Sequence, residues 1–400
     1  MVKDILDMTT FMSILILILL LVSMLAYFIK SKNMDIWIMP YLRGVIKRKD
    51  KVDGPIHILF CYVDHYEPMW RKPTIEIERM RVDRWMNDYP KLCEGHRDSD
   101  GRFPQHTFFY PEEEYREEHL NKIEKLCRSG YGEIEIHLHH DDDTSENLAK
   151  TLTDFKNILH EKHGALPILN DSNDVGYAFI HGNWCLDNSR KDGKRCGVND
   201  ELLVLKNTGC YGDFTFPSAP DETQTSTINK IYYAKDDPAK PKSHDKGREL
   251  EVGGVKWGDM IIFQGPLTLN WRKRKFGIMP KIENGDIKSS IPPDQNRINM
   301  WINANIHVKG RPEWVFVKIH THGTQERDME TILGEKTNEM FSYLESKYND
   351  SKNYILHYVT AREMFNIAKA AEAGKKGNPN DYRDYLLAPP KAYSYYPNDN

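Results

Sequence analysis

Hydrophobic and polar residues follow two different rhythms along most of this 400-residue chain. Short apolar runs such as HILFCYV and WVFVKI are bounded by polar or turn residues, as is typical of buried strands. Longer stretches repeat apolar residues at helical spacing. Because the two kinds alternate from about residue 56 to 373, the pattern predicts an α/β fold with a mostly parallel sheet. Roughly seven or eight strand–helix units favour a distorted (β/α)7–8 barrel over a doubly wound sheet.

Turn and capping residues set the expected limits of these elements. The expected strands lie at 56–63, 105–111, 133–138, 175–184, 210–218, 259–267, 313–323 and 353–359. The expected helices lie near 74–90, 111–128, 143–160, 199–209, 328–347 and 360–374. Asp143 and Glu146 have the spacing of a capping box, as do Thr360 and Glu363. Gly209 is placed to end a helix.

Composition divides the chain into four parts. We expect a transmembrane anchor at 1–30, a juxtamembrane connector at 31–53, a barrel domain at 54–376 and a C-terminal tail at 377–400. Two stretches of the barrel domain, 220–258 and 270–297, are expected as insertions because they interrupt the alternation of strands and helices.

Residues 8–29 contain no charged side chain. A helix of this length spans roughly 33 Å, which is enough to cross a bilayer. A cleaved signal peptide is the alternative, but the apolar run is longer than a signal core and no clear A-x-A site follows it. We therefore expect an uncleaved anchor that crosses the membrane once.

Basic residues flank this segment unequally. Lys3 precedes it, whereas six basic residues follow within twenty positions: Lys30, Lys32, Arg43, Lys47, Arg48 and Lys49. Because basic residues favour the cytoplasmic side, the asymmetry favours a cytoplasmic globular part. A long translocated domain can override this bias, so the extracytoplasmic side stays open.

Overall composition narrows the function classes. Hydrophobic residues make up 40% of the chain, enough for a real core, and the formal net charge of −4 gives no general attraction to nucleic acid. The six cysteines contain no C-x-x-C pair, which excludes thiol–zinc and thioredoxin-type motifs. Cys61 and Cys127 fall in apolar patterns and are expected as buried thiols. One disulfide can form among Cys185, Cys196 and Cys210, which lie in or near expected loops.

The candidate chemistry lies at the expected carboxyl ends of strands, where barrel enzymes carry their active sites. The chain has sixteen histidines, and at least six fall at these positions. The sequence EIEIHLHHDDDT is the densest example. The strand-end candidates are Asp64, His65, Glu67, His137, His139, His140, Asp141, His181, Asn183, Asp213, His320 and His322.

Two His-x-His pairs place both imidazoles of each pair on one face of a strand. Imidazole with carboxylate suits zinc, manganese, iron or cobalt, and a catalytic site needs about three protein ligands and an open position. A single histidine is more often a hydrogen-bonded lining residue, but the whole cluster 137–141 favours ligation. Glu133 and Glu135 lie deeper on the same face, either as partners of the histidines or in salt bridges at the barrel floor.

These residues resemble the glycoside hydrolase/deacetylase superfamily, and within it the polysaccharide deacetylases of the NodB type. CYVDHYEP stands where that family has an Asp-Asp motif, and GEIEIHLHHD stands at its His-containing motif. VFVKIHTHG is similar to a late strand that supplies a histidine, and the segment from 357 to 374 is similar to the family's closing strand and helix. The resemblance covers roughly residues 55–373.

The resemblance implies a role for each matched residue. Asp64 would be the base, and His320 or His322 the general acid. His137 would be the first metal ligand, with His65, His139 and Asp141 as further candidates. Asp-His replaces Asp-Asp here, Asp141 stands in place of the second histidine, and the family's Arg-Pro motif is not seen.

The sequence thus favours a membrane-anchored hydrolase that uses a divalent metal, zinc first, to remove acetyl groups from an N-acetylated sugar polymer or glycolipid. Trp184 is expected to stack on a sugar ring, with His181, Asn183 and Asp213 as further substrate-binding candidates. The alternatives are a metal-free glycosidase using Asp64 and Asp213, a two-metal phosphoesterase, and a non-catalytic glycan-binding scaffold.

Overall fold

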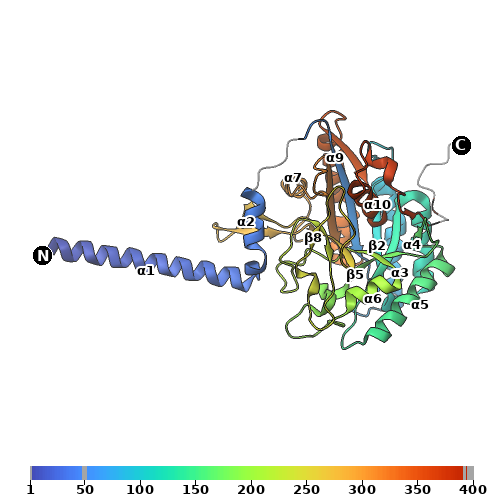
Figure 1. Cartoon of the computed structure of the whole chain (residues 1–400). Coiled ribbons are helices and arrows are strands. Elements are labelled where there is room, and N and C mark those ends of the chain that lie inside the picture. Colours follow the sequence, from blue (N-terminus) through green and yellow to red (C-terminus); the bar gives the residue numbers. More distant parts are fainter. Residues whose placement is uncertain (1, 47–51, 391–392, 394–400) are drawn as a thin grey trace.

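The computed structural model describes residues 2–46, 52–390 and 393, and Figure 1 shows the whole chain. The helices are α1 (Val2–Ser31), α2 (Ile38–Ile46), α3 (Ile75–Cys93), α4 (Glu117–Leu126), α5 (Ser145–His163), α6 (Glu201–Thr208), α7 (Gln295–Asn303), α8 (Glu326–Ile332), α9 (Glu335–Tyr348) and α10 (Ala361–Glu372). The strands are β1 (Ile56–His65), β2 (His106–Pro111), β3 (Gly132–Leu138), β4 (Ile168–Leu169), β5 (Tyr177–His181), β6 (Cys210–Asp213), β7 (Ile231–Ala234), β8 (Arg248–Glu249), β9 (Met260–Phe263), β10 (Thr268–Lys275), β11 (Met279–Glu283), β12 (Asp286–Ile287), β13 (Trp314–Thr321), β14 (Tyr354–Tyr358) and β15 (Leu387–Ala388).

One large sheet forms the centre of the globular part. Its strand order is β12-β13-β1-β2-β3-β5-β6-β9-β7-β8, and β14 pairs with the first half of β1. The pairs from β12 to β9 are parallel, whereas β7 runs antiparallel to β9 and to β8. The expected α/β fold with a mostly parallel sheet is therefore confirmed. Within the described residues, strand pairing ends at β12 and β8 and does not close the expected barrel.

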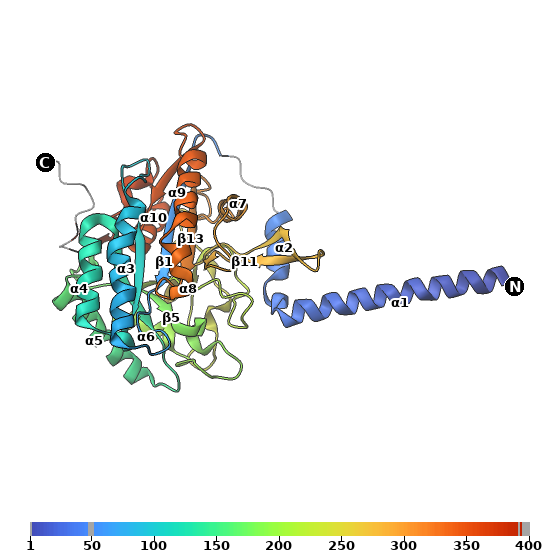
Figure 2. The ribbon, with the colours of Figure 1, turned by 180° about the vertical axis from the view of Figure 1, so that it is seen from behind.

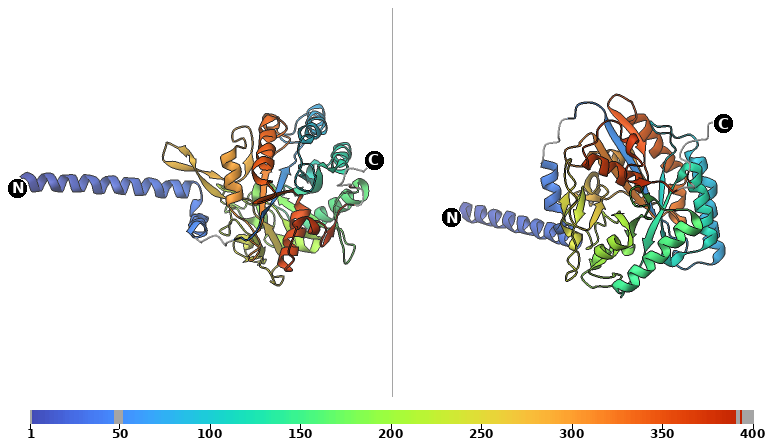
Figure 3. Two further views of the ribbon diagram at one scale, coloured as in Figure 1. Left: turned by 90° about the horizontal axis from the view of Figure 1, so that it is seen from above. Right: turned by 45° about the vertical axis from the view of Figure 1, so that its right-hand side comes forward.

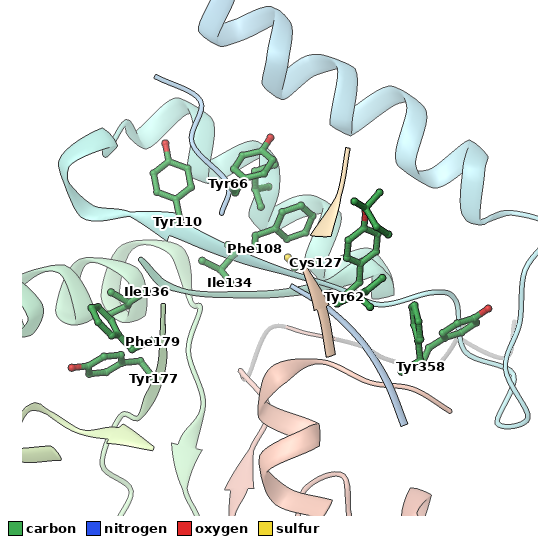
Figure 4. Packing of buried hydrophobic residues seen from close by; sticks show 14 of the residues in the cluster. Tyr62, Tyr66, Phe108, Tyr110, Cys127, Ile134, Ile136, Tyr177, Phe179 and Tyr358 are labelled. Atoms are coloured by element: carbon green, nitrogen blue, oxygen red, sulfur yellow. The ribbon is translucent and has the colours of Figure 1, made fainter. Parts of the chain in front are cut away.

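The two faces of the sheet pack against different helices. Alternate residues such as Tyr62, Phe108 and Ile136 lie on an outer face, in one cluster with residues of α3 to α7 and α9 (Figure 4). Their neighbours, such as Val63 and Phe109, lie on an inner face with residues of α10. Figure 2 shows α3, α4, α5 and α9 arranged along one side of the sheet. Because both faces are covered, the central strands read as continuous apolar runs.

The stretches expected as insertions differ in what they form. Residues 220–258 contribute β7 and β8 to the main sheet, because the apolar residues Ile231–Ala234 pair with β9. Residues 270–297 contain most of a separate β10–β11 hairpin, β12 and the start of α7. The expected tail also adds a strand, β15, which pairs with β4.

The ends of three helices, α5, α6 and α10, test the expected capping residues. Gly209 ends α6 at a φ of 100°, and Thr360 with Glu363 forms the expected capping box of α10. At α5 the cap is Thr144, which accepts a hydrogen bond from the Asn147 amide, so the prediction that Asp143 begins this helix is wrong. The side chain of Asp143 contacts His140 through one oxygen and accepts from the Thr144 amide and the Asn147 side chain through the other.

The cysteine predictions are confirmed and made specific. Cys61 and Cys127 are buried free thiols. The disulfide joins Cys185 to Cys196, whereas Cys210 is free and buried in β6. The disulfide closes the loop that follows β5.

The N-terminal helix projects away from the globular part, as the two views of Figure 3 show. Its segment Thr10–Ser31 is apolar, and an 18-residue window within it has a mean hydropathy of 2.8 with no residue buried. It is long and apolar enough to span a membrane, as the sequence predicted. The expected connector forms a short helical turn, η1 (Met34–Ile36), and α2, while residues 47–51 lie outside the described part.

Candidate metal centre

Three strands of the parallel sheet deliver five potential ligands to one place. His65 ends β1 on the inner face, in register with Phe109 of β2, and Glu67 follows two residues later. His137 lies on the same face of β3, and His139 follows that strand. His322 follows β13, the parallel neighbour of β1. Parallel strands end at one edge of a sheet, which is why residues so far apart in sequence meet here.

The Glu67 carboxylate is shared by two sets of ligand atoms. His137 Nε2 lies 3.4 Å from Glu67 Oε1, and His139 Nε2 lies 3.5 Å from the same oxygen. These three residues form one group whose ligand atoms all lie within 4.8 Å of one another. Glu67 forms a second such group with His65 and His322.

Hydrogen bonds to the other ring nitrogens orient two of the histidines. His137 Nδ1 donates to the Ile180 carbonyl oxygen at 2.7 Å, and His139 Nδ1 contacts Glu113 Oε1 at 2.5 Å. Both rings therefore present Nε2 to the shared carboxylate. Metal-binding histidines are commonly fixed in this way by a carbonyl or carboxylate on the opposite nitrogen.

His65 and His322 stack on each other. Their ring centroids lie 4.6 Å apart with an interplanar angle of 21°, and the His65 ring is also 4.8 Å from that of His137. Burial, together with the neighbouring histidines, lowers the pKa of His65 well below its ordinary value. The neutral ring that results is the form that ligates metal ions.

The two backbone segments that carry these residues are tied together. The Thr324 hydroxyl donates to the Glu67 carbonyl oxygen at 2.6 Å, and the Gly323 amide donates to Asp64 Oδ1 at 2.6 Å. The ends of β1 and β13 are thereby held in register, which fixes His322 relative to Glu67.

Charge in the group is concentrated on Glu67. Burial raises the pKa of this carboxyl group, but its hydrogen bond with His137 and the charges of His322 and His139 outweigh burial and lower the pKa to about 2. Burial also opposes protonation of His139, whereas its bond to Glu113 raises the pKa of the ring. An anionic oxygen among imidazoles is a donor set that suits a divalent cation.

Asp64 and Asp141, both expected in the site, lie apart from this group. Asp64 is on the outer face of β1, where its carboxylate accepts from Gly323 and contacts His106 Nε2 at 2.9 Å. Successive residues of a strand point to opposite faces, so Asp64 and His65 cannot both face the inner side. Asp141 is exposed, and its carboxylate accepts from the Arg195 amide.

His320 lies beside the group on the inner face of β13. Its ring centroid is 6.4 Å from that of His65. Burial, more than any charge nearby, lowers the pKa of His320 to about 3, so its ring is neutral near pH 7. A neutral ring cannot donate the proton required of a general acid unless a partner recharges it.

A third group forms on the outer side of β5. His140 Nε2 lies 3.2 Å from Glu201 Oε1, and His181 Nε2 lies 3.5 Å from the same oxygen. His140 Nδ1 also contacts Asp143 Oδ2 at 3.0 Å. Burial opposes protonation of His140, but these two carboxylates raise its pKa. The group thus contains the donor atoms of a metal site. It also forms an ion pair that joins Glu201 of α6 to His140 at the strand ends.

Of the expected substrate-binding residues, Trp184 lies nearest the first two groups. Its ring is 6.5 Å from the His322 ring at 85°, and its indole N–H has no hydrogen-bond partner within the described part of the chain. Trp184 and Asn183 both have positive φ, 58° and 56°, which is unusual for a bulky residue. His181 belongs to the third group instead.

Asp213 is buried in β6 and bound to Thr215 through both carboxylate oxygens. Burial raises its pKa and lowers that of Lys318, which donates to the Phe216 carbonyl oxygen at 2.5 Å. Glu135 accepts from the Ala178 amide, and Glu133 pairs with Arg362 at 2.9 Å. Glu133 is therefore salt-bridged, which was one of the two alternatives, whereas Glu135 is held by the Ala178 amide and the Tyr211 hydroxyl.

Glu67 was a strand-end candidate without an assigned role, and Glu113 was not among the expected site residues. Glu67 is two residues beyond His65, the spacing that keeps two side chains on one face of an extended segment. Glu113 belongs to an acidic run, 112–114, that directly follows the apolar strand β2. The position of that run at a strand end was the available signal.

The donor chemistry fits a divalent metal ion. Four imidazoles and one carboxylate converge, two imidazoles are oriented by partners on the opposite nitrogen, and the His65 ring is kept neutral. In comparisons with known proteins, no family model and no curated protein matches this chain.

Proposed function

We propose that this protein is a membrane-anchored, metal-dependent hydrolase that removes acetyl groups from an N-acetylated carbohydrate polymer or glycolipid of the cell envelope. The convergence of His65, Glu67, His137, His139 and His322 at the carboxyl ends of three parallel strands is the observation that carries the proposal. The acetylated-sugar substrate rests on the resemblance of the strand-end motifs to polysaccharide deacetylases.

Each residue of the group has a distinct part in this reaction. His137 and His139 would hold the ion through Nε2, with His65 as the third imidazole. The ion, zinc first and manganese, iron or cobalt as alternatives, would supply Lewis acidity that polarises the amide carbonyl and acidifies water. Glu67, rather than Asp64, is near enough to these rings to accept the proton of the attacking water.

The leaving amine needs a proton donor at the edge of the site. His322 suits this part better than His320, because His322 is only partly buried and lies beside Trp184. The Trp184 ring, which lies beside His322, would stack on a sugar ring.

A two-metal phosphoesterase is the second candidate, favoured by the sharing of Glu67 between two ligand groups. A carboxylate shared in this way can bridge two ions about 3.5–4 Å apart, the separation used in two-metal phosphate chemistry. The metal-free glycosidase has less support, because Asp64 and Asp213 are buried and engaged with separate partners.

The disulfide bears on the side of the membrane. Disulfides rarely persist in the cytosol, so Cys185–Cys196 favours an extracytoplasmic globular part. The basic residues after the anchor favour the cytoplasm, but long domains translocate largely regardless of such charges. We therefore propose the extracytoplasmic side, and the accessibility of Lys150 to a membrane-impermeant amine reagent in intact cells tests it.

Acetate release from N-acetylated chitooligosaccharides and peptidoglycan fragments tests the reaction. The full-length protein in detergent should release acetate after loading with one of the four metals, and Glu67→Gln should not. His160→Ala, a substitution in α5 outside the three groups, should behave as wild type. Turnover of bis(p-nitrophenyl) phosphate with two ions per chain and no acetate release would favour the phosphoesterase instead.

A further inference from the structure

An exposed apolar tip distinguishes the β10–β11 hairpin from the rest of the globular surface. Trp271, Phe276 and Ile278 are 56%, 85% and 65% exposed, although large apolar side chains are normally buried. The hairpin projects from the body of the molecule next to α2 and α1 (Figures 1 and 2). Apolar residues exposed at the end of a projecting hairpin (Phe276 and Ile278) and along its first strand (Trp271) indicate a surface that another phase or molecule covers.

Positive charge surrounds this tip. Residues 272–275 read RKRK, Lys281 lies on the returning strand, and no acidic residue occurs between 268 and 282. Arg272, Arg274 and Lys275 are exposed, whereas Lys273 pairs with Asp294 at 2.7 Å. An apolar tip within a ring of cations is complementary to an anionic lipid surface, where the cations meet phosphates and the apolar side chains enter the interface.

The base of the hairpin is packed against the end of α1. Leu267 and Leu269 share one hydrophobic cluster with Met34 and Trp37. Ile282 packs against this cluster, as do Phe28 and Ile29 at the end of α1. Asn33 also donates to the Pro220 carbonyl oxygen at 3.0 Å. The direction of the hairpin relative to α1 is therefore fixed by packing.

That direction is toward the membrane that α1 would cross. In Figure 3 the hairpin points the same way as α1 leaves the globular part. The neighbouring helix α2 also exposes apolar side chains, with Val45 at 64% and Ile46 at 81%. Hairpin tip and α2 thus lie on the side of the molecule from which the apolar helix departs.

We propose that the β10–β11 hairpin docks onto an anionic bilayer surface, with Phe276 and Ile278 in the lipid interface and Arg272, Arg274 and Lys275 at the phosphates. This docking rests on the proposal that α1 spans the membrane. With the anchor and the hairpin as two points of attachment, the globular part has one orientation relative to the bilayer.

The test uses the full-length protein reconstituted in nanodiscs. A polarity-sensitive fluorophore is attached at Phe276→Cys, and at Lys150→Cys on α5, which lies on the far side from α1, as the matched control. The native free cysteines that the structure describes are buried, so labelling is directed to the introduced ones. Nitroxide lipids report contact with the bilayer, in discs of phosphatidylcholine alone or mixed with phosphatidylglycerol.

At position 276 we expect quenching several-fold stronger than at position 150, and stronger in anionic than in neutral discs. Reversing charge with Arg272→Glu and Lys275→Glu should remove the anionic preference. Equal quenching at positions 276 and 150 would overturn docking, and equal quenching in both lipids would overturn the electrostatic part. Shielding of the tip in lipid-free micelles together with a dimer mass would assign the surface to a second copy of the chain.

A label at Leu19→Cys, within the apolar segment, separates failure of this inference from failure of the proposed anchor. Strong quenching at position 19 with none at position 276 would leave the anchor in place and overturn docking alone. Metal content and acetate release are measured independently on the unlabelled protein, so loss of the hydrolase proposal would not change the outcome at the hairpin.

Discussion

Removing one ligand from the five-residue group tests whether the group binds metal at all. His137→Ala deletes an imidazole whose Nε2 faces Glu67 and whose Nδ1 is held by the Ile180 carbonyl oxygen. Glu67→Gln keeps the shape of the shared side chain and removes its charge. Both changes alter only side chains of the ligand group, so each should weaken metal binding while the sheet keeps its structure.

The magnitude follows from the usual strength of four-ligand sites. Such sites bind zinc with about 10–16 kcal/mol near pH 7, or about 3 kcal/mol per ligand. Since 1.4 kcal/mol is a factor of ten, loss of His137 should weaken metal binding by about 100-fold or more. Glu67→Gln keeps the three imidazoles but removes the negative charge beside the ion, so we expect metal binding to weaken at least about tenfold.

The assay is elemental analysis of the full-length protein, followed by competition with a chromogenic chelator. Wild type and His160→Ala should hold equal amounts of metal, one ion per chain for the deacetylase and two for the phosphoesterase. Circular dichroism establishes that each variant is folded. If His137→Ala and Glu67→Gln bind the ion as tightly as wild type, or if wild type binds none of the four metals, the group is a hydrogen-bonded network and the proposed chemistry is refuted.

Two further changes probe the surroundings of this group, and a third tests the buried ion network around Glu363 at the start of α10. A side chain at Gly182 would place its Cβ 2.2 Å from the His139 ring. Gly182→Ala should therefore displace the ring and weaken metal binding about tenfold, as measured by competition with a chelator. Unchanged affinity would show that the ring adapts. Trp184→Ala should raise KM by on the order of tenfold with a smaller change in kcat, measured on acetylated oligosaccharides, because stacking contributes on the order of 1 kcal/mol; a loss confined to kcat would contradict this. Burial raises the pKa of Glu363, but the charges of Arg102, Arg383 and Arg362 outweigh burial and lower the pKa from 4.5 to about 2. The charged carboxylate should therefore add about 3 kcal/mol to the free energy of unfolding above pH 4.5, and this contribution should be lost as the pH falls toward 2. Urea unfolding followed against pH in detergent tests this, and Glu363→Gln should be less stable by about 3–5 kcal/mol at pH 7 and nearly insensitive to pH in that window.

The sequence predicted the strands better than it predicted which side chains meet. A run such as HILFCYV is apolar on both faces, because the sheet is covered on both faces, so its pattern does not reveal which face is inner. Asp64 and His65 were therefore placed in one site although they point in opposite directions. The strand EIEIHL does alternate, and its polar face with His137 is indeed the inner one.

Beyond the strand ends, periodicity gives no further guidance. Asp141 follows His139 at the right spacing for one face, but the chain has left the strand there and Asp141 turns to the Arg195 amide. Glu113 reaches His139 from the loop after a different strand, a contact that depends on sheet order. Likewise, the choice of Cys196 rather than Cys210 as the partner of Cys185 depends on Cys210 being buried in β6.

Asp64 lies outside the ligand group, but it still supports that group from the outer face of β1. Its carboxylate accepts from the Gly323 amide and contacts His106, and the Trp85 indole donates to the Gly323 carbonyl oxygen at 2.9 Å. Even a Cβ at Gly323 would lie 2.0 Å from the Asp64 carboxylate, so the turn after His322 is packed directly on this side chain. Asp64 is thus a positioning residue: from the outer face of β1 it fixes the backbone of the turn that presents His322 to the ligand group on the inner face.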